Sequence, residues 1–230
     1  MNYLKLCQDM ARDVGIPGSG PDDVASTTLS EEENNIVRYI NQANIDIESR
    51  WFDWNFLWTE VDLSASADVS TLTSPTNLGN WKLETIIWNK TSSDYQVLEY
   101  MDWDEYTDMY KYGTVATGIP ESFSVKPTNV LDLYPTPNVA GTVSAEYFKV
   151  PTDLAVDSDT SLIPTRFHRI IIARAKLYYA ENEDAPEIMS GSLAEFEDLL
   201  DKLEADELPA QKARRFSRVQ DISNFTVVTE

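Results

Sequence analysis

The sequence is poor in the residues that carry most enzyme and metal chemistry. Its 230 residues include one cysteine, Cys7, and one histidine, His168. A single cysteine excludes an intramolecular disulfide and is typical of a protein made in a reducing cytoplasm. The GxSxG, HExxH and CxxC motifs are absent, which removes the more specific signatures of hydrolases, zinc proteases and zinc-binding folds. We therefore predict no catalytic residue, no cofactor and no metal site, and we expect Cys7 to pack in the core.

The sequence also has no long apolar stretch. No run approaches the roughly 18 residues that a transmembrane helix needs. The N-terminal residues MNYLKLCQDMARDVG contain no basic segment followed by an apolar one. We expect a protein that neither spans a membrane nor carries a signal peptide for export.

Basic residues are scarce. The chain has 18 lysines and arginines against 39 acids, a formal net charge of −21, and an isoelectric point near 4.2. Affinity for nucleic acid comes mainly from Lys and Arg side chains that neutralise phosphates, so a DNA-binding surface is not expected. Apolar residues make up 42% and aromatic residues 11% of the chain, which predicts a folded protein despite the charge.

The few basic residues are unevenly placed. The C-terminal segment 209–230, which we call the arm, contains four bases and two acids, so the first 208 residues hold 14 bases and 37 acids. A basic segment on an acidic body is typical of a docking segment for another subunit, because opposite charge steers encounter while like charge keeps free copies apart. We expect the arm to bind the head-side partner named below. The predicted partner-binding residues are Lys212, Arg214, Arg215, Phe216, Arg218, Phe225 and Val227.

Near its end the arm contains Phe-Thr-Val-Val, residues 225–228, which favours a β-strand and lacks proline and glycine. Such a segment is able to add a strand to the sheet edge of a neighbouring subunit. Two other interpretations stay open at this point. In one, residues 225–228 pair with the sheet of their own chain; in the other, the arm is an ordinary loose terminus.

Apolar residues recur at helical spacing in four segments. The first covers residues 2–14, and the second follows a Ser-x-x-Glu capping box at Ser30 and ends near Arg50. The third, residues 166–179, is apolar on nearly all sides and should lie centrally. A break at Pro186 separates it from a fourth, amphipathic helix.

Between these helices the pattern is that of short strands with turn residues between them. One short helical segment, residues 102–111, interrupts the strands. The sequences KPTN at 126–129 and PTPN at 135–138 predict hairpin turns, and hence a meander of the last three strands. The expected strands are residues 56–63, 82–89, 95–99, 121–126, 129–134 and 142–150.

The order of elements is helices, then strands, then helices. It predicts an α+β fold in which the N- and C-terminal helices form one bundle, with an inserted antiparallel β-domain and an extended C-terminal tail. The expected divisions are N-terminal helices at 1–55, the β-domain with its short helix at 56–151, C-terminal helices at 163–207, and the extended basic docking tail at 208–230.

An aromatic run, WFDWNFLW at residues 51–58, follows the second helix. We expect it to form the hinge core where the helices meet the sheet, and a sugar-binding platform is the alternative. Two acidic clusters, within 102–108 and 153–159, are of the kind that binds calcium or acts as a glycosidase acid pair. The first lies at a predicted helix N-terminus and the second lacks the EF-hand pattern, so both are interpreted as solvated faces. His168 lies in the helix expected to be most buried, and we assign it no catalytic role.

Five segments stand in a recognisable order along residues 1–209. They are NQANIDIESRWFDWNFL at 41–57, WDEYTDMYKYG with GIPESF after it, LDLYPTP at 131–137, IPTRFHRIII at 163–172 and YYAENEDAPE at 178–187. In this order they resemble the head-to-tail adaptor, or connector, proteins of tailed bacteriophages. None of the segments is a catalytic motif, and the arm from Gln211 onwards lies outside the resemblance.

The resemblance implies a helical bundle that carries a β-domain, which agrees with the order of elements. It also implies a virion structural protein, not an enzyme, that is made in the host cytoplasm and located at the head-tail neck. There it would form a homo-oligomeric ring of about twelve copies, with the portal protein on its head side and a tail, stopper or terminator protein on its tail side. DNA would pass through the lumen without specific binding, which suits an acidic protein.

Functions of other classes stay open. One is a tail-tip or fibre module that binds host glycans through the aromatic-rich region, with Trp54 and Trp58 as the stacking residues. Another is an acid-pair glycosidase.

Overall fold

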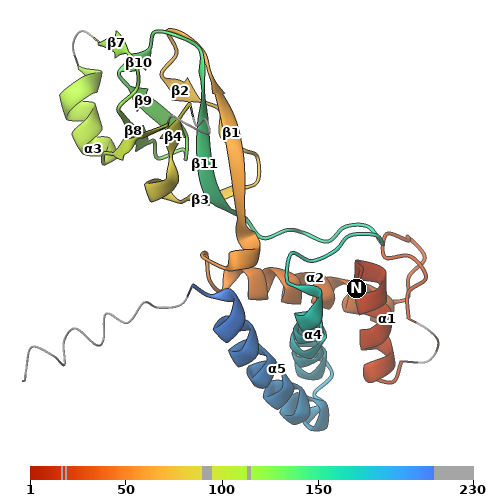
Figure 1. Ribbon diagram of the computed structural model, residues 1–230. Coiled ribbons are helices and arrows are strands. Elements are labelled where there is room, and N and C mark those ends of the chain that lie inside the picture. Colours follow the sequence, from red (N-terminus) through yellow and green to blue (C-terminus); the bar gives the residue numbers. More distant parts are fainter. Residues whose placement is uncertain (17, 19, 90–94, 113–114, 210–230) are drawn as a thin grey trace, which may run out of the picture.

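The structure is a computed structural model that describes residues 1–16, 18, 20–89, 95–112 and 115–209. A helical part and a β part lie at opposite ends of the molecule in Figure 1. The chain passes from helices to strands through a 3-10 turn, Asn55–Leu57, and returns to the helices through residues 150–162. The α+β fold predicted from the sequence is confirmed.

Helices from both ends of the chain form the helical part. They are α1 (Tyr3–Asp13), α2 (Glu31–Ser49), α4 (Arg169–Asn182) and α5 (Pro186–Glu207). Helix α2 begins with the predicted capping box: Glu33 N donates to the Ser30 hydroxyl at 3.2 Å, and Ser30 N donates to the Glu33 carboxylate at 2.8 Å. Helix α5 begins with a proline, whose missing N–H would have no partner in a first turn.

Helix α4 is the centre of the helical part. Ile170, Ile171 and Ile172 point in different directions around the helix, and all three are fully buried. Helices α1, α2 and α5 pack around α4 and together cover it. Cys7 of α1 lies in the same core, as expected, and burial raises the pKa of its thiol to about 12. The central position predicted for this segment is confirmed.

The larger sheet is built around its longest strand, β11. Alternate β11 residues Val143, Ala145 and Tyr147 are buried, as expected for a strand with one covered face. They belong to a second hydrophobic core, distinct from that of the helices. Strand β11 (Gly141–Lys149) pairs antiparallel with β1 (Trp58–Ala65) on one side and with β3 (Leu78–Trp81) and β4 (Ile87–Trp88) on the other, and β5 (Gln96–Val97) lies beyond β4.

A second sheet covers the same core. Its strand order is β2 (Thr71–Leu72), β9 (Leu131–Tyr134), β8 (Ser122–Val125) and β6 (Glu99–Tyr100). The KPTN hairpin turn between β8 and β9 is confirmed, since Lys126 N donates to Val130 O at 2.8 Å. Asn129 adopts a φ of 61° in this turn, which asparagine tolerates better than most residues.

The predicted meander of the last three strands is wrong, because β9 and β11 belong to different sheets. The PTPN sequence is not a hairpin turn. It contains strand β10 (Thr136–Pro137), which pairs parallel with β7 (Thr117–Gly118). Strand β6 also pairs parallel with β8, so the β part is mixed and not wholly antiparallel. Proline-rich composition indicates a turn but does not exclude a short edge pairing, which needs few N–H donors.

The short helical segment predicted at 102–111 is confirmed. It consists of α3 (Trp103–Tyr106), capped by Asp102, and a π-helical turn, Thr107–Lys111. The buried Tyr106 donates its hydroxyl to Leu133 O at 3.2 Å, which fixes α3 against the second sheet.

Gly141 at the start of β11 and Gly191 in α5 provide a matched test of the packing around β11. A β-carbon on Gly141 would lie 2.5 Å from Trp88 Cζ2 and 2.7 Å from Asn89 Oδ1, whereas one on Gly191 in α5 would meet nothing within 4 Å. We predict that Gly141→Ala lowers the free energy of unfolding by about 1–3 kcal/mol. Gly191→Ala should raise it by about 0.5–1 kcal/mol, because alanine is the better helix former. Urea unfolding of both variants is the measurement, and destabilisation of the same size in both would contradict the packing at Gly141.

Candidate interaction surfaces

The seven partner-binding residues predicted from the sequence, Lys212, Arg214, Arg215, Phe216, Arg218, Phe225 and Val227, lie outside the described residues. The described chain ends at Pro209, one residue after Leu208, which packs against the helical core. The candidate surfaces below are therefore those of the body from which the arm departs.

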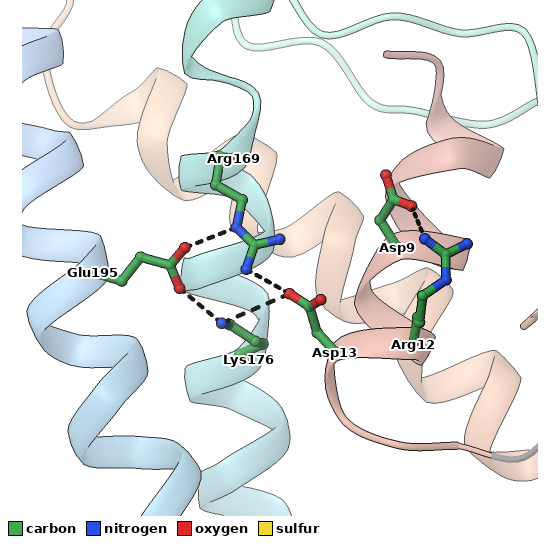
Figure 2. Close-up of polar contacts among 6 residues, drawn as sticks. All are labelled: Asp9, Arg12, Asp13, Arg169, Lys176 and Glu195. Carbon is green, nitrogen blue, oxygen red and sulfur yellow. Dashed lines mark hydrogen bonds and ion pairs between the residues drawn. The ribbon is translucent and has the colours of Figure 1, made fainter.

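A network of four charged side chains joins three helices (Figure 2). Arg169 of α4 donates to Glu195 of α5 at 2.7 Å and lies 2.6 Å from Asp13 of α1. Lys176 lies about two turns further along the same face of α4, 2.8 Å from Glu195 and 3.8 Å from Asp13. Burial opposes ionisation of Glu195, but its hydrogen bonds to Arg169 and Lys176 prevail and lower its pKa. The network holds two acids and two bases, so it fixes α1 and α5 against α4 and leaves no net charge.

The contacts of Glu195 should contribute more to the free energy of unfolding than those of an exposed ion pair. We predict that Glu195→Gln lowers the free energy of unfolding by about 1–2 kcal/mol, because two partly buried cations lose their shared anion. Asp198→Asn on the same helix removes an exposed pair with Lys202 and should change it by at most about 0.5 kcal/mol. Chemical unfolding of both variants at one ionic strength makes the comparison, and equal losses would show that the network has no special role.

Glu48 holds the returning chain against helix α2. The side chain is fully buried, and its carboxylate accepts from Thr152 N at 2.8 Å, Leu162 N at 3.2 Å and the Ser161 hydroxyl at 3.2 Å. Asn44, one turn earlier, donates to Thr152 O at 3.0 Å. Desolvation dominates over these hydrogen bonds and raises the Glu48 pKa above its usual value of 4.5. This clamp fixes the segment that leads from the β part back to α4.

The raised pKa of Glu48 sets the sign of a pH effect. Because the folded state holds this proton more tightly than the unfolded state, its contribution to stability is complete below about pH 4.5 and is lost as the pH rises through the folded-state pKa. In Glu48→Gln this contribution to the pH dependence should disappear. Unfolding free energies of wild type and variant, measured from pH 4 to pH 8, give the comparison. A difference between them that stays constant over this range would contradict the raised pKa.

The aromatic run at 51–58 divides between core and surface. Trp54 is fully buried in the helical core, with its Nε1 donating to Ile47 O at 3.1 Å and its ring stacked on Phe56 at 5.2 Å. Trp51, Phe52 and Trp58 are instead exposed, Phe52 by 64%. The hinge-core prediction thus holds for part of the run only. A glycan platform that includes Trp54 is excluded by its burial.

Trp51 and Phe52 border a pocket of about 230 Å³ between the helical and β parts. Trp51, Phe52 and Leu57 line one side, and Gly79 with Val150 lines another. Trp51 Nε1 also donates to Glu204 of α5 at 3.0 Å. The last turns of α5, from which the arm continues, therefore lie beside this pocket.

Strand β1 forms an acidic edge of the larger sheet. Its burial alternates, so that Trp58, Glu60, Asp62 and Ser64 face solvent while Leu63 and Ala65 face the core. Glu60 lies directly opposite Glu146 of β11, and Asp62 lies opposite Ser144, whose hydroxyl donates to it at 2.6 Å. Lys82 Nζ and Trp58 Nε1 both bind Glu146, at 2.7 and 2.9 Å. The backbone of Glu60 pairs with β11, and its side chain has no hydrogen bond or ion pair with the residues that the structure describes.

His168 and the acidic clusters have structural roles. His168 is buried between the N-terminal amino group of Met1, 2.9 Å from Nδ1, and Ile163 O, 2.8 Å from Nε2, and desolvation lowers its pKa. Asp102 caps α3, and Asp159 accepts from Ala155 N and Val156 N. Among the residues that the structure describes, no group of three His, Cys, Asp or Glu side chains is placed to hold a metal ion. No helix in the described ranges is both long and apolar enough to cross a membrane.

The fold is α+β, and its candidate surfaces are the hinge pocket and the acidic edge of β1. The family comparison places the chain more narrowly: it belongs to the SU10 adaptor protein family, whose model matches residues 1–221, and it is a phage adaptor protein. The match extends beyond the resemblance seen in the sequence and includes all four basic residues of the arm. No curated protein matches the chain.

Proposed function

We propose that the protein is a head-to-tail adaptor that forms a ring between the portal of a DNA-filled head and the tail. Membership of the SU10 adaptor family over residues 1–221 is the observation that carries this proposal. The ring contains about twelve copies joined by one repeated head-to-tail interface that closes by rotation. The portal protein lies on its head side, and a tail, stopper or terminator protein on its tail side.

The charge of the chain supports a role in which DNA passes without being bound. The net charge is −21, with 39 acidic residues against 18 basic ones. An acidic wall repels the phosphate backbone, so DNA would slide through a lumen of this charge without adhering. The protein acts through binding and has no turnover in this role.

The location of the protein in the virus particle tests this function. Antibody labelling of purified particles, viewed by negative-stain electron microscopy, should place the label at the neck between head and tail. Label at the distal tip of the tail would instead support the glycan-binding module, and particles without label would contradict a virion role.

Removal of the arm should separate folding from docking. The residues that the structure describes in both hydrophobic cores all precede position 209, so we expect a chain that ends at Leu208 to keep the thermal unfolding midpoint of the full chain. It should fail to attach to DNA-filled heads, because the arm carries the basic residues predicted to bind another subunit. Co-sedimentation with heads that lack this protein measures attachment. Undiminished attachment of the shortened chain would remove the docking role of the arm.

A further inference from the structure

We propose that the open edge of strand β1 receives the arm of the adjacent copy in the ring, which joins the larger sheet as a further strand. The inference rests on the proposed function, since only an oligomer supplies a neighbour's arm. It identifies the subunit that the arm reaches: a second copy of this chain in place of the head-side partner expected from the sequence.

The outer edge of β1 is long, and no strand among the described residues pairs with it. The strand has eight residues, about 27 Å at 3.3–3.4 Å per residue. Within the described residues its ladder partner is β11 alone, so its other side presents unpaired N–H and C=O groups. An exposed edge of this length is a template for another strand, and proteins commonly protect such edges with charge or cover them. The Phe-Thr-Val-Val segment at 225–228 has the composition of a strand that could cover it.

The charges of edge and arm are complementary. The solvent face of β1 and β11 carries Glu60, Asp62 and Glu146 against Lys82. Glu60 and Glu146 are directly opposite each other, an arrangement that is unfavourable for two carboxylates and that additional cations would relieve. The arm brings four bases within residues 212–218. Charge therefore attracts the arm to this face, and backbone pairing fixes it there.

The arm is long enough to reach a neighbour. Glu204 in the last turns of α5 binds both Arg50 and Trp51, so α5 ends beside the hinge. Residues 210–230 span up to about 70 Å when extended. Pairing along all of β1 uses less than half of this length, and the remainder crosses to the next copy.

The positions of the β1 edge and of the end of α5 favour an arm that binds the adjacent copy over one that binds its own chain. In Figure 1, β1 forms the right-hand border of the larger sheet, whereas α5 ends on the left of the hinge. In a ring with head-to-tail contacts, the left flank of one copy meets the right flank of the next. An arm that leaves from one flank and an open edge on the other are the two halves of such a contact.

Exchange of charge between edge and arm tests the inference in the full-length protein. The edge variant is E60K/D62K, and the arm variant is R214E/R215E. The control is E187K/E197K, which makes the same charge change as the edge variant at exposed positions of α5. Attachment to DNA-filled heads that lack the protein is measured by co-sedimentation. The edge and arm variants should each attach about tenfold less than wild type, and the control should attach normally. A lysine at position 60 would face Glu146, so the edge variant should remain folded.

The decisive step is an equimolar mixture of the edge and arm variants. Suppose that each arm reaches the next copy and that the two variants alternate around the ring. The acidic arm of the arm variant then meets the basic edge of the edge variant, and the unchanged arm of the edge variant meets the unchanged edge of the arm variant. Attachment should therefore return to near wild type. If the arm binds its own sheet, only the chain with all four substitutions is rescued. If it binds the portal, neither combination is rescued. Either of these results, or full attachment of the edge variant alone, overturns the inference.

Failure of the inference differs from failure of the proposed function. Wild-type protein that does not attach to heads removes the adaptor role, and the inference falls with it. Wild-type protein that attaches while the mixture stays inactive keeps the adaptor role and removes the arm-to-edge contact.

Discussion

Burial of helix α4 on all sides is the constraint on which the rest of the structure depends. Three consecutive isoleucines at 170–172 are inaccessible to solvent, so every direction around the helix must be covered. Segments from both ends of the chain do this: α1 and α2 come before the β part, and α5 comes after it. Each buried isoleucine contributes about 1.5–3 kcal/mol relative to exposure, which is large beside the stability of an ordinary domain. The β part must therefore leave and rejoin the helices at a place that keeps the two ends together.

The two crossings between the parts are built differently, and both limit movement. The outgoing chain is anchored by Trp54, whose ring lies in the helical core immediately before β1. The returning chain is held by Glu48, which binds backbone N–H groups at Thr152 and Leu162. A buried carboxylate without a paired cation is costly, and the hydrogen bonds from these backbone donors offset only part of that cost, since the Glu48 pKa remains raised. Trp54 and Glu48 therefore fix the β part relative to the helices at both crossings.

The sequence predicted those features that depend on local chemistry. The capping box of α2, the all-round apolar pattern of α4, and the KPTN turn follow from neighbouring residues, and each is confirmed. Strand pairing depends on distant residues, and the two predictions that needed it, a hairpin turn at PTPN and one meander that joins β9 to β11, are wrong. Strands β2, β7 and β10 have only two residues each, which is too short for an alternation of apolar and polar residues to reveal them in the sequence.

The candidate surfaces show the same division between local and distant information. The alternation in WTEVDLSA, with Trp58, Glu60 and Asp62 on one face, indicates a strand that is half solvated. That β1 lies at an edge, and that Glu60 faces Glu146, depends on pairing with a strand more than 80 residues later. The hinge run divides for a similar reason: aromatic composition predicts burial, but only the path of the chain decides that Trp54 points inward and Phe52 outward.

The distribution of charge supports the proposed contact between the arm and a neighbouring copy. Of the 14 bases in the first 208 residues, ten already form ion pairs with acids of the same chain, namely Lys5, Arg12, Arg50, Lys82, Lys126, Arg166, Arg169, Arg174, Lys176 and Lys202. The remaining surface is dominated by carboxylates, so two bodies that approach each other repel. The proposed ring of such bodies needs cations that offset this repulsion. The arm holds four bases within residues 212–218, and in the contact that we propose they would lower the repulsion between neighbouring copies at the acidic edge of β1.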